Sequence, residues 1–126
     1  MKDYKPSGYN SVSPYLVVNG AQRMIDLLTK IFDVKVLRRY DDGSRILHAE
    51  VQLDDSVVMI ADSTDGWPPN NSLIHVYVED VDATYKKALA AGCESVQEPK
   101  TREGDPDKRG GFSDFSGNSW FIGTQQ

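Results

Sequence analysis

Residues 15–20, Tyr-Leu-Val-Val-Asn-Gly, and residues 75–80, His-Val-Tyr-Val-Glu-Asp, decide the fold of this chain. Each stretch is an apolar, β-branched run followed by residues suited to begin a helix, so each predicts a strand that leads into a helix. The two junctions are about 60 residues apart, and the same succession of elements follows each of them. This internal repeat predicts a fold built from two similar halves.

The first half continues with an amphipathic helix and three strands. Apolar residues recur at helical spacing after Asn19, which we expect to be the N-cap. They are Met24, Ile25, Leu28, Ile31 and Phe32. Strands are predicted at 34–40, 46–53 and 57–61, because turn-forming Asp, Gly and Ser residues separate these runs.

The second half repeats this order. We expect a strand at 73–78, a helix capped by Asp80, and a helix end near Gly92. The predicted apolar stripe of this helix is Val81, Tyr85, Ala88 and Leu89. A strand at 93–97, a long loop at 98–111 and a hairpin of 112–115 with 119–123 complete the half. One βαβββ unit cannot cover its own sheet, so two units must pair, within one chain or between chains.

The boundaries follow from composition. Residues 1–11 are polar and predict an N-terminal arm, and residues 12–126 predict one domain with modules at 12–63 and 72–125. The loop between the modules is rich in Pro, Gly and Asn, and we expect its Trp67 to be exposed.

Composition also excludes several classes of protein. The net charge of −5 argues against binding to nucleic acid or to an anionic membrane surface. There is no apolar run of roughly 20 residues and no signal peptide, which predicts a cytoplasmic protein. The single cysteine, Cys93, allows no disulfide and is expected to be a small buried residue.

The repeat resembles the vicinal oxygen chelate superfamily, which includes glyoxalase I, extradiol dioxygenases, and bleomycin and fosfomycin resistance proteins. The segments that carry the resemblance are 14–18, 47–51, 57–62, 78–82 and 114–120. The Pro-Tyr-Leu opening and the His-Ala-Glu strand are similar to the PhnB-like branch. The resemblance implies an α+β fold of two βαβββ modules that form a cleft-shaped mixed sheet with helices on its outer face. It also implies a homodimer.

The resemblance places the metal ligands of the family at four strand positions, which here hold Ser13, Met59, Leu73 and Phe121. Three of these residues are apolar, and the set lacks the oxygen and imidazole donors that Mg²⁺, Zn²⁺, Ni²⁺ or Fe²⁺ requires. Shifting the register by one residue gives Pro14, Ile60, Ile74 and Ile122, which is no better. We therefore expect no metal at this site and no cofactor.

Side chains alternate across a strand, so these four positions define which residues face the cleft. The predicted ligand-binding residues are Tyr15, His48, Glu50, Met59, His75, Tyr77 and Phe121. Apolar walls with a few polar groups are typical of a small-molecule site. The aromatic residues are equally compatible with core or dimer packing.

His48 and Glu50 are the candidates for catalysis. They lie two residues apart on one strand, so the carboxylate could orient an imidazole that serves as a general base. The alternative is a hydrogen-bonded pair on a solvated sheet face. His75 could join them in a non-standard metal site of two histidines and a glutamate.

Residues 102–111 lack the Gly-Lys-Ser/Thr of a phosphate-binding loop. A lid over the cleft is the better hypothesis, with Arg109 available to an anionic group.

Three functions remain open. The first is a metal-independent protein that binds a small molecule, for example a drug-sequestering protein. The second is a glyoxalase-like lyase or isomerase that uses His48 and Glu50, with or without an atypical metal. The third is a structural or regulatory dimer whose cleft is filled by side chains. Whether the chain is an enzyme is not decided by its sequence.

Overall fold

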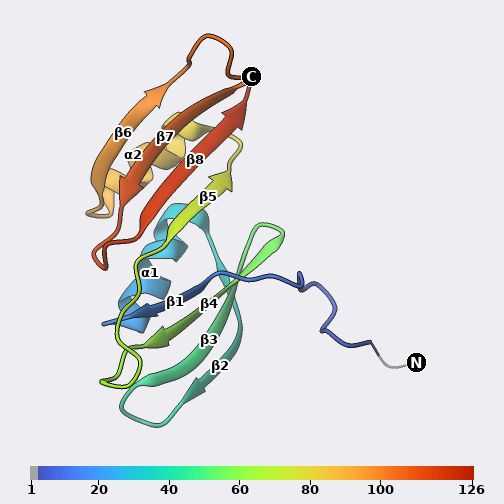
Figure 1. Cartoon of the computed structure of the whole chain (residues 1–126), viewed down its shortest axis with the longest axis vertical. Coiled ribbons are helices and arrows are strands. Elements are labelled where there is room, and N and C mark those ends of the chain that lie inside the picture. The colour runs from blue at the N-terminus through green and yellow to red at the C-terminus, as the bar shows by residue number, and fades with distance from the viewer. Residues whose placement is uncertain (1–2) are drawn as a thin grey trace. The chain divides into compact units, whose positions relative to one another are not determined.

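The computed structural model describes residues 3–126, which belong to two units. Unit 1 ends at Pro69, and unit 2 is Asn70–Gln126. Each unit contains a strand, a helix and three further strands, as Figure 1 shows. The structure therefore confirms the predicted α+β fold of two βαβββ modules.

Unit 1 forms a four-stranded mixed sheet in the order β1-β4-β3-β2. Strand β1 runs parallel to β4, and the other neighbours are antiparallel. Its elements are β1 (Tyr15–Val18), α1 (Ala21–Phe32), β2 (Lys35–Asp41), β3 (Ile46–Leu53) and β4 (Ser56–Asp62).

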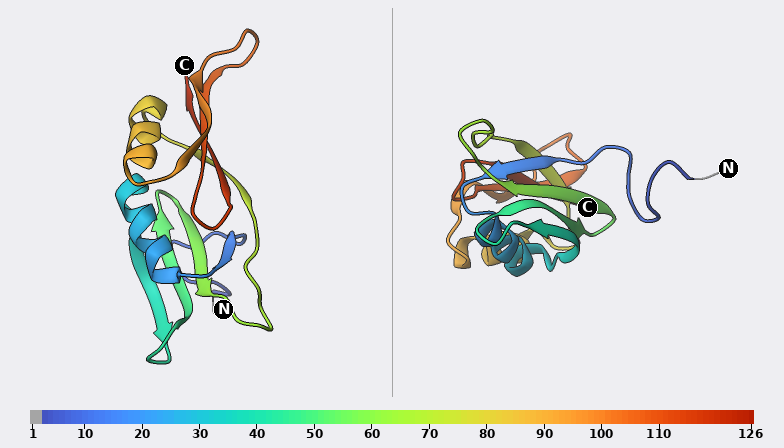
Figure 2. Two further views of the ribbon diagram at one scale, coloured as in Figure 1. Left: turned by 90° about the vertical axis from the view of Figure 1, so that its left-hand side faces the viewer. Right: turned by 90° about the horizontal axis from the view of Figure 1, so that it is seen from below.

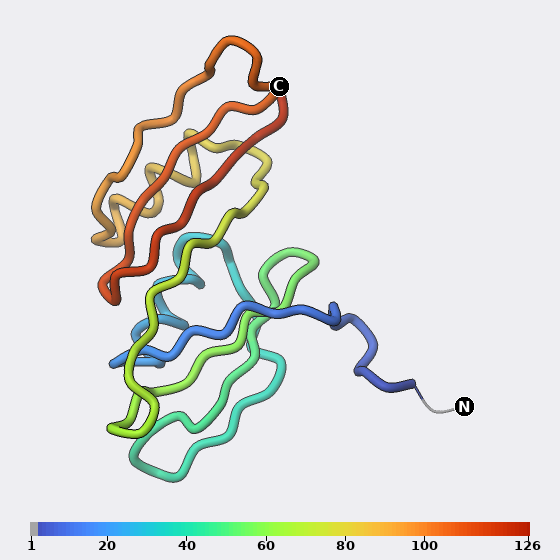
Figure 3. The backbone as a smooth tube through the Cα atoms, viewed as in Figure 1, coloured from blue at the N-terminus to red at the C-terminus, as the bar shows by residue number. Residues whose placement is uncertain are grey.

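Unit 2 repeats this topology in the order β5-β8-β7-β6, with β5 parallel to β8. Its elements are β5 (Leu73–Tyr77), α2 (Val81–Ala90), β6 (Glu94–Lys100), β7 (Asp107–Ser113) and β8 (Ser119–Gln125). The backbone trace in Figure 3 follows the connection from β4 to β5, which contains Trp67. Trp67 is 74% exposed, as predicted.

In each unit the helix packs on one face of its own sheet (Figure 2), and the apolar residues between them form the core. In unit 1, α1 buries Met24, Leu28 and Ile31 against the sheet. In unit 2, Trp120 and Ile122 are completely buried, as predicted from strand alternation. The predicted stripe of α2 is wrong at Leu89, which is exposed, whereas Thr84 is buried in its place.

The two helices begin differently. Asp80 caps α2 as predicted, since its carboxylate accepts from the Ala83 N–H at 3.1 Å. Asn19 does not cap α1; the N-cap is Gly20, whose φ of 110° is in the left-handed region that favours glycine. The side-chain acceptor comes instead from Asp62, at the end of β4, which lies 2.7 Å from the Ala21 N–H.

The loop predicted at 98–111 is wrong. Strand β6 continues to Lys100 and β7 begins at Asp107, so the two form one antiparallel hairpin. The polar composition of this segment resembles a loop, because β6 is an edge strand and most of its side chains are exposed.

Two further observations concern features predicted from composition. No helix within residues 3–126 has the length and apolar character needed to cross a bilayer. Cys93 is buried, and this burial raises the pKa of its thiol to about 11, so the thiol is not a reactive nucleophile.

Candidate functional site

The face of the unit 1 sheet that is not covered by α1 carries a row of chemically distinct side chains. Strand register places Met59 between Tyr15 on β1 and Glu50 on β3, and places Arg38 of β2 beside Glu50. Tyr15 is 40% exposed, whereas Glu50 is only 6% exposed. The row therefore combines accessible aromatic surface with a buried carboxylate.

Two of these side chains, Tyr15 and Glu50, form a continuous hydrogen-bonded network with His48 and Tyr9. His48 Nε2 lies 2.8 Å from Glu50 Oε2, and His48 Nδ1 lies 2.7 Å from the Tyr15 hydroxyl. The other oxygen of Glu50 accepts from the hydroxyl of Tyr9. In the neutral imidazole, Nε2–H therefore donates to the carboxylate and Nδ1 accepts from Tyr15.

Glu50 remains charged although it is buried. Burial raises the pKa of its carboxyl, but hydrogen bonds from Tyr9 and His48 outweigh this effect, and the pKa lies below its ordinary value. The guanidinium of Arg38, 3.8 Å away, acts in the same direction. Burial, together with the nearby charge of Glu50, raises the pKa of Tyr15, which keeps this phenol protonated.

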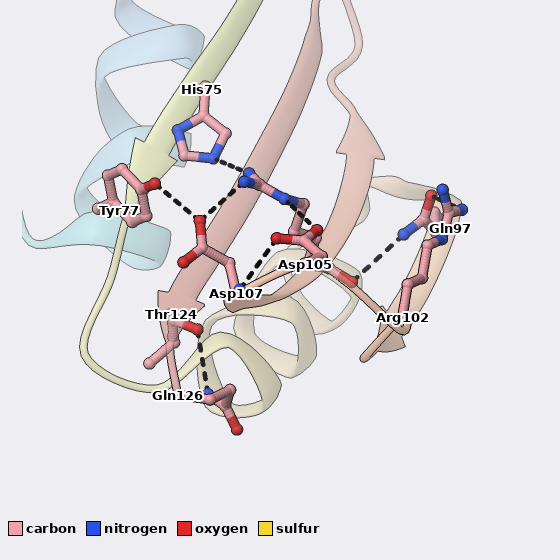
Figure 4. A network of polar contacts seen from close by, with 9 residues as sticks. His75, Tyr77, Gln97, Arg102, Asp105, Asp107, Thr124 and Gln126 are labelled. Atoms are coloured by element: carbon pink, nitrogen blue, oxygen red, sulfur yellow. Dashed lines mark hydrogen bonds and ion pairs between the residues drawn. The ribbon is translucent and has the colours of Figure 1, made fainter.

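The corresponding face of unit 2 carries a different network, shown in Figure 4. Arg109 lies at its centre and contacts three side chains. Its Nε donates to Asp105 at 2.8 Å, its Nη2 to Asp107 at 2.7 Å, and its Nη1 lies 3.0 Å from His75 Nε2. The hydroxyl of Tyr77 also donates to Asp107, at 2.7 Å.

This network corrects the hypothesis that Arg109 belongs to a lid and receives an anionic group. Arg109 lies in β7, not in a loop. Its charge is compensated by two carboxylates, Asp105 and Asp107, so one arginine faces two acids and the cluster does not attract anions. The sequence offered a signal for this pairing, because the acids lie four and two residues before the arginine.

The predicted metal positions do not fit a metal ion. Ser13, Met59, Leu73 and Phe121 provide one hydroxyl, one thioether and two hydrocarbon side chains. Mg²⁺, Zn²⁺, Ni²⁺ and Fe²⁺ require carboxylate or imidazole donors in proteins. No group of three or more His, Cys, Asp or Glu residues within 3–126 is arranged to hold a metal ion. We therefore derive no chemistry through a metal.

The seven predicted ligand-binding residues lie in two groups. Tyr15, His48, Glu50 and Met59 come together on the unit 1 sheet. His75, Tyr77 and Phe121 come together on the unit 2 sheet, where His75 pairs with Phe121 and contacts the ring of Tyr77.

Sequence reasoning missed several partners of these residues. Tyr9 was assigned to the N-terminal arm, and Arg38, Asp105 and Asp107 were not considered. Tyr9 reaches Glu50 from 41 positions away, so no local pattern could have shown this contact. Arg38 could have been found, because it lies opposite Glu50 once β2 and β3 are paired.

Comparison with protein families gives one match over most of the chain. The model of the Glyoxalase/Bleomycin resistance protein/Dioxygenase superfamily matches residues 9–122. An uncharacterised protein of Mycobacterium bovis is 31% identical over 126 aligned positions, which cover 90% of this chain and 82% of that protein.

Solved structures share the fold at low sequence identity. TioX from Micromonospora sp. ML1 has a TM-score of 0.74 and 21% identity, with coverage of 93% of this chain and 97% of TioX. TnmS3, an antibiotic-binding protein from Streptomyces sp. CB03234, has a TM-score of 0.71 and 16% identity, with both chains fully covered. The fosfomycin resistance protein FosX from Listeria monocytogenes has a TM-score of 0.68 and 15% identity, covering 93% of each chain.

Proposed function

Because the chain belongs to the Glyoxalase/Bleomycin resistance protein/Dioxygenase superfamily, we propose that it binds a small organic molecule without a metal ion. The candidate contact residues are Tyr15, His48, Glu50 and Met59 on the unit 1 sheet and, as a separate group, His75, Tyr77 and Phe121 on the unit 2 sheet. Homodimerisation and a cytoplasmic location are part of this proposal.

The proposal rests on one observation. Three of the four positions that hold metal ligands in the family are apolar here, and they lie beside hydrogen-bonding side chains on the same sheet face. Met59 lies beside Tyr15 and Glu50, and Phe121 lies beside His75. Leu73 is 75% exposed and Tyr77 is 62% exposed. Accessible apolar side chains next to a few fixed polar groups are the usual composition of a small-molecule site.

The fold relatives support this interpretation. TnmS3 is an antibiotic-binding protein and FosX is a fosfomycin resistance protein, so at least one protein of this fold binds a small organic molecule. A drug-sequestering role is therefore the specific form of binding that we propose.

Metal content tests the proposal. Protein purified without chelator or metal-affinity resin is analysed by elemental mass spectrometry and then titrated with Mn²⁺, Ni²⁺ and Zn²⁺. We expect no stoichiometric metal before or after titration. A near-stoichiometric metal that is lost in His48→Ala would overturn the proposal and favour the lyase.

Ligand binding is then measured in buffer containing a chelator, with bleomycin and fosfomycin among the compounds of a thermal-shift screen. We expect at least one compound to raise Tm, and Tyr15→Ala or Tyr77→Ala to weaken its binding. Retained binding in both variants would remove these sheet faces from the site.

The second candidate function is a lyase or isomerase, which the geometry of His48 favours. Its Nδ1 accepts from the Tyr15 hydroxyl while its Nε2 donates to Glu50, as in a proton relay. In this arrangement Tyr15 is the group that meets the substrate. Turnover of an α-carbonyl thiohemiacetal such as that of methylglyoxal and glutathione, lost in both Tyr15→Phe and His48→Gln, would support it.

A further inference from the structure

The hydrogen-bonding roles in the unit 2 network are fixed by the chemistry of arginine. Arg109 Nη1 lies 3.0 Å from His75 Nε2. A guanidinium has five donors and no acceptor, so Nε2 of His75 must accept. The single proton of the neutral imidazole then lies on Nδ1, because the hydrogen bond made by one ring nitrogen determines where the proton is.

Arg109 is held in the orientation that this bond requires. Asp105 receives its Nε and Asp107 receives its Nη2, at 2.8 and 2.7 Å. Asp107 is 3% exposed and also accepts from the hydroxyl of Tyr77. The two carboxylates therefore fix the plane of the guanidinium by binding its Nε and Nη2, and the third nitrogen, Nη1, is directed to His75.

A glycine makes the contact possible. Gly123 of β8 lies between Tyr77 on β5 and Arg109 on β7, so the contact from Arg109 to His75 crosses β8 at this residue. A Cβ atom at position 123 would lie 3.2 Å from His75 Nε2 and 3.7 Å from Arg109 Nη1. A methyl group there would be closer than usual to the imidazole and in ordinary van der Waals contact with the guanidinium, so the imidazole would have to move by a few tenths of an ångström.

The surroundings of His75 favour its neutral form. Burial lowers the pKa of the imidazole, and the positive charge of Arg109 lowers it further, while Asp107 opposes both effects. The other groups of the cluster are Tyr77 on the same strand and Asp105, which faces Arg109. His75 is nevertheless an exposed residue of β5, so a ligand can reach this side chain.

We propose that Arg109 is a positioning residue that holds His75 as the neutral Nδ1–H tautomer, and that this N–H donates to an oxygen acceptor of the bound molecule, such as a carbonyl. The inference rests on the proposed function, since it names a chemical feature of the same ligand.

The tautomer is measured first, without any ligand. The full chain is labelled with ¹⁵N-histidine, and long-range ¹H–¹⁵N spectra are recorded at pH 7.5; His48→Gln assigns the two imidazoles. We expect an unprotonated Nε2 and a protonated Nδ1 in His75. Arg109→Met and Gly123→Ala should shift both signals towards the Nε2–H form, whereas Lys108→Met, a neighbouring cation paired with Asp82, should not. An Nε2–H tautomer in the unaltered chain overturns the proposal.

The ligand feature is then tested with two aromatic probes of similar size. Benzamide offers a carbonyl acceptor, and benzylamine offers only donors. We expect benzamide to shift the His75 Nδ1–H signal and benzylamine not to. In Arg109→Met the affinity for benzamide should fall about fivefold, as for the loss of one hydrogen bond. Equal effects of the two probes, or no effect of benzamide at millimolar concentration, overturn the proposed donor role.

The two proposals fail in different ways. If the compound screen finds a ligand that leaves the His75 signals unchanged, the binding function stands and the role of His75 falls. If the tautomer is Nδ1–H but no compound of the screen binds, the proposed function falls and the action of Arg109 on His75 stands.

Discussion

Unit 1 and unit 2 share strand order and register but carry opposite chemistry at corresponding positions. Met59 and Phe121 occupy equivalent positions in their sheets. Met59 is in β4, between β1 and β3, and Phe121 is in β8, between β5 and β7. On the neighbouring antiparallel strand, Glu50 of β3 lies opposite Met59, whereas Gly111 of β7 lies opposite Phe121. A carboxylate in one unit is matched by the absence of a side chain in the other.

Gly111 cannot be replaced by a larger residue without movement of its neighbour. A Cβ atom there would lie 2.9 Å from the ring of Phe121. The positions two residues earlier are His48 and Arg109, and each reaches the first strand of its sheet, at Tyr15 and His75. The comparison teaches that one duplicated backbone supports two polar networks because small residues in unit 2 leave room for a long side chain.

Asp62 in unit 1 and Asp114 in unit 2 each accept several hydrogen bonds, and the two differ in burial. Asp114 in unit 2 is buried and accepts from the Trp120 indole N–H and from backbone and side-chain N–H groups of Asn118. Asp62 in unit 1 is only partly buried and accepts from the N–H groups of Ala21 and Ile46.

The largest effect is expected for Asp114→Ala. It would leave the buried donors of Trp120 and Asn118 unpaired and lower the free energy of unfolding by about 3–4 kcal/mol. Asp62→Ala should cost about 2 kcal/mol, because water can reach the donors it leaves. Urea unfolding followed by circular dichroism measures both, with the exposed Asp65→Ala as a control. Equal costs would contradict the difference in burial.

The next effect concerns the dependence of stability on pH. The pKa of Glu50 in the folded chain lies below its ordinary 4.5, so the unfolded chain binds the proton more tightly. The stabilisation is fully present above pH 4.5 and is lost as the pH falls through the lower, folded-state pKa. Glu50→Gln should make acid unfolding less steep.

At pH 7 the same substitution should cost about 1–2 kcal/mol, since Gln retains the shape but not the charge that Tyr9 and His48 donate to. Unfolding free energies at a series of pH values between 3 and 7 test this. The exposed Glu103→Gln should leave the profile unchanged. An identical profile for Glu50→Gln and the unaltered chain would mean that Glu50 is not held in its charged form.

A smaller effect is expected at the start of α2. Asp80→Ala removes one of two side-chain acceptors at this helix start and should cost about 1 kcal/mol, as is usual for an N-cap; the other acceptor, Thr124 Oγ1, takes the Val81 N–H at 2.9 Å. The exposed neighbour Glu79→Ala is the matched control. A thermal-unfolding scan that finds no difference between the two variants would contradict the assignment of the cap.

The smallest change in stability is expected for Gly123→Ala. The backbone there is extended, and an alanine would be tolerated at a cost of about 1 kcal/mol or less. Its effect should instead be seen at the His75 imidazole, because the added methyl group lies 3.2 Å from His75 Nε2 and requires the ring to move by a few tenths of an ångström. Ala61→Gly at the matching strand position of unit 1 should leave the His48 signals unchanged.

The fold was predictable from the sequence because two strand-to-helix junctions recur with the same succession of apolar runs. The error at 98–111 arose where β6 forms an edge, since exposed strand residues such as Glu98 and Lys100 have no apolar alternation to indicate a strand. The N-cap of α1 was missed for a similar reason. Asp62 lies at the end of β4, 41 residues from Ala21, so the residues around the helix start do not predict this contact.

The candidate site was partly predictable. Alternation along β3 placed His48 and Glu50 on one face, and the structure shows them hydrogen-bonded. It could not show that Glu50 is buried, because part of its cover comes from Tyr9, a residue distant in sequence. The alternative of a hydrogen-bonded pair on a solvated face therefore holds for the hydrogen bond but not for the exposure of the glutamate. Arg109 was found as a notable residue but given the wrong surroundings, since the strand that contains it was read as a loop.

The hydrogen bond from the Ala21 N–H of α1 to Asp62 has a consequence for the order in which the chain folds. The first turn of α2 has a local cap at Asp80, three residues from the N–H it serves, and a distant acceptor in Thr124 of β8, which takes the Val81 N–H. The first turn of α1 depends on a carboxylate 41 residues away, and the same carboxylate binds the N–H of Ile46 at the start of β3. In a kinetic experiment we therefore expect the first turn of α2 to gain its Asp80 cap before β8 is in place, and the first turn of α1 to be capped only as β3 and β4 pair, so that the two similar halves reach their similar structures by different routes.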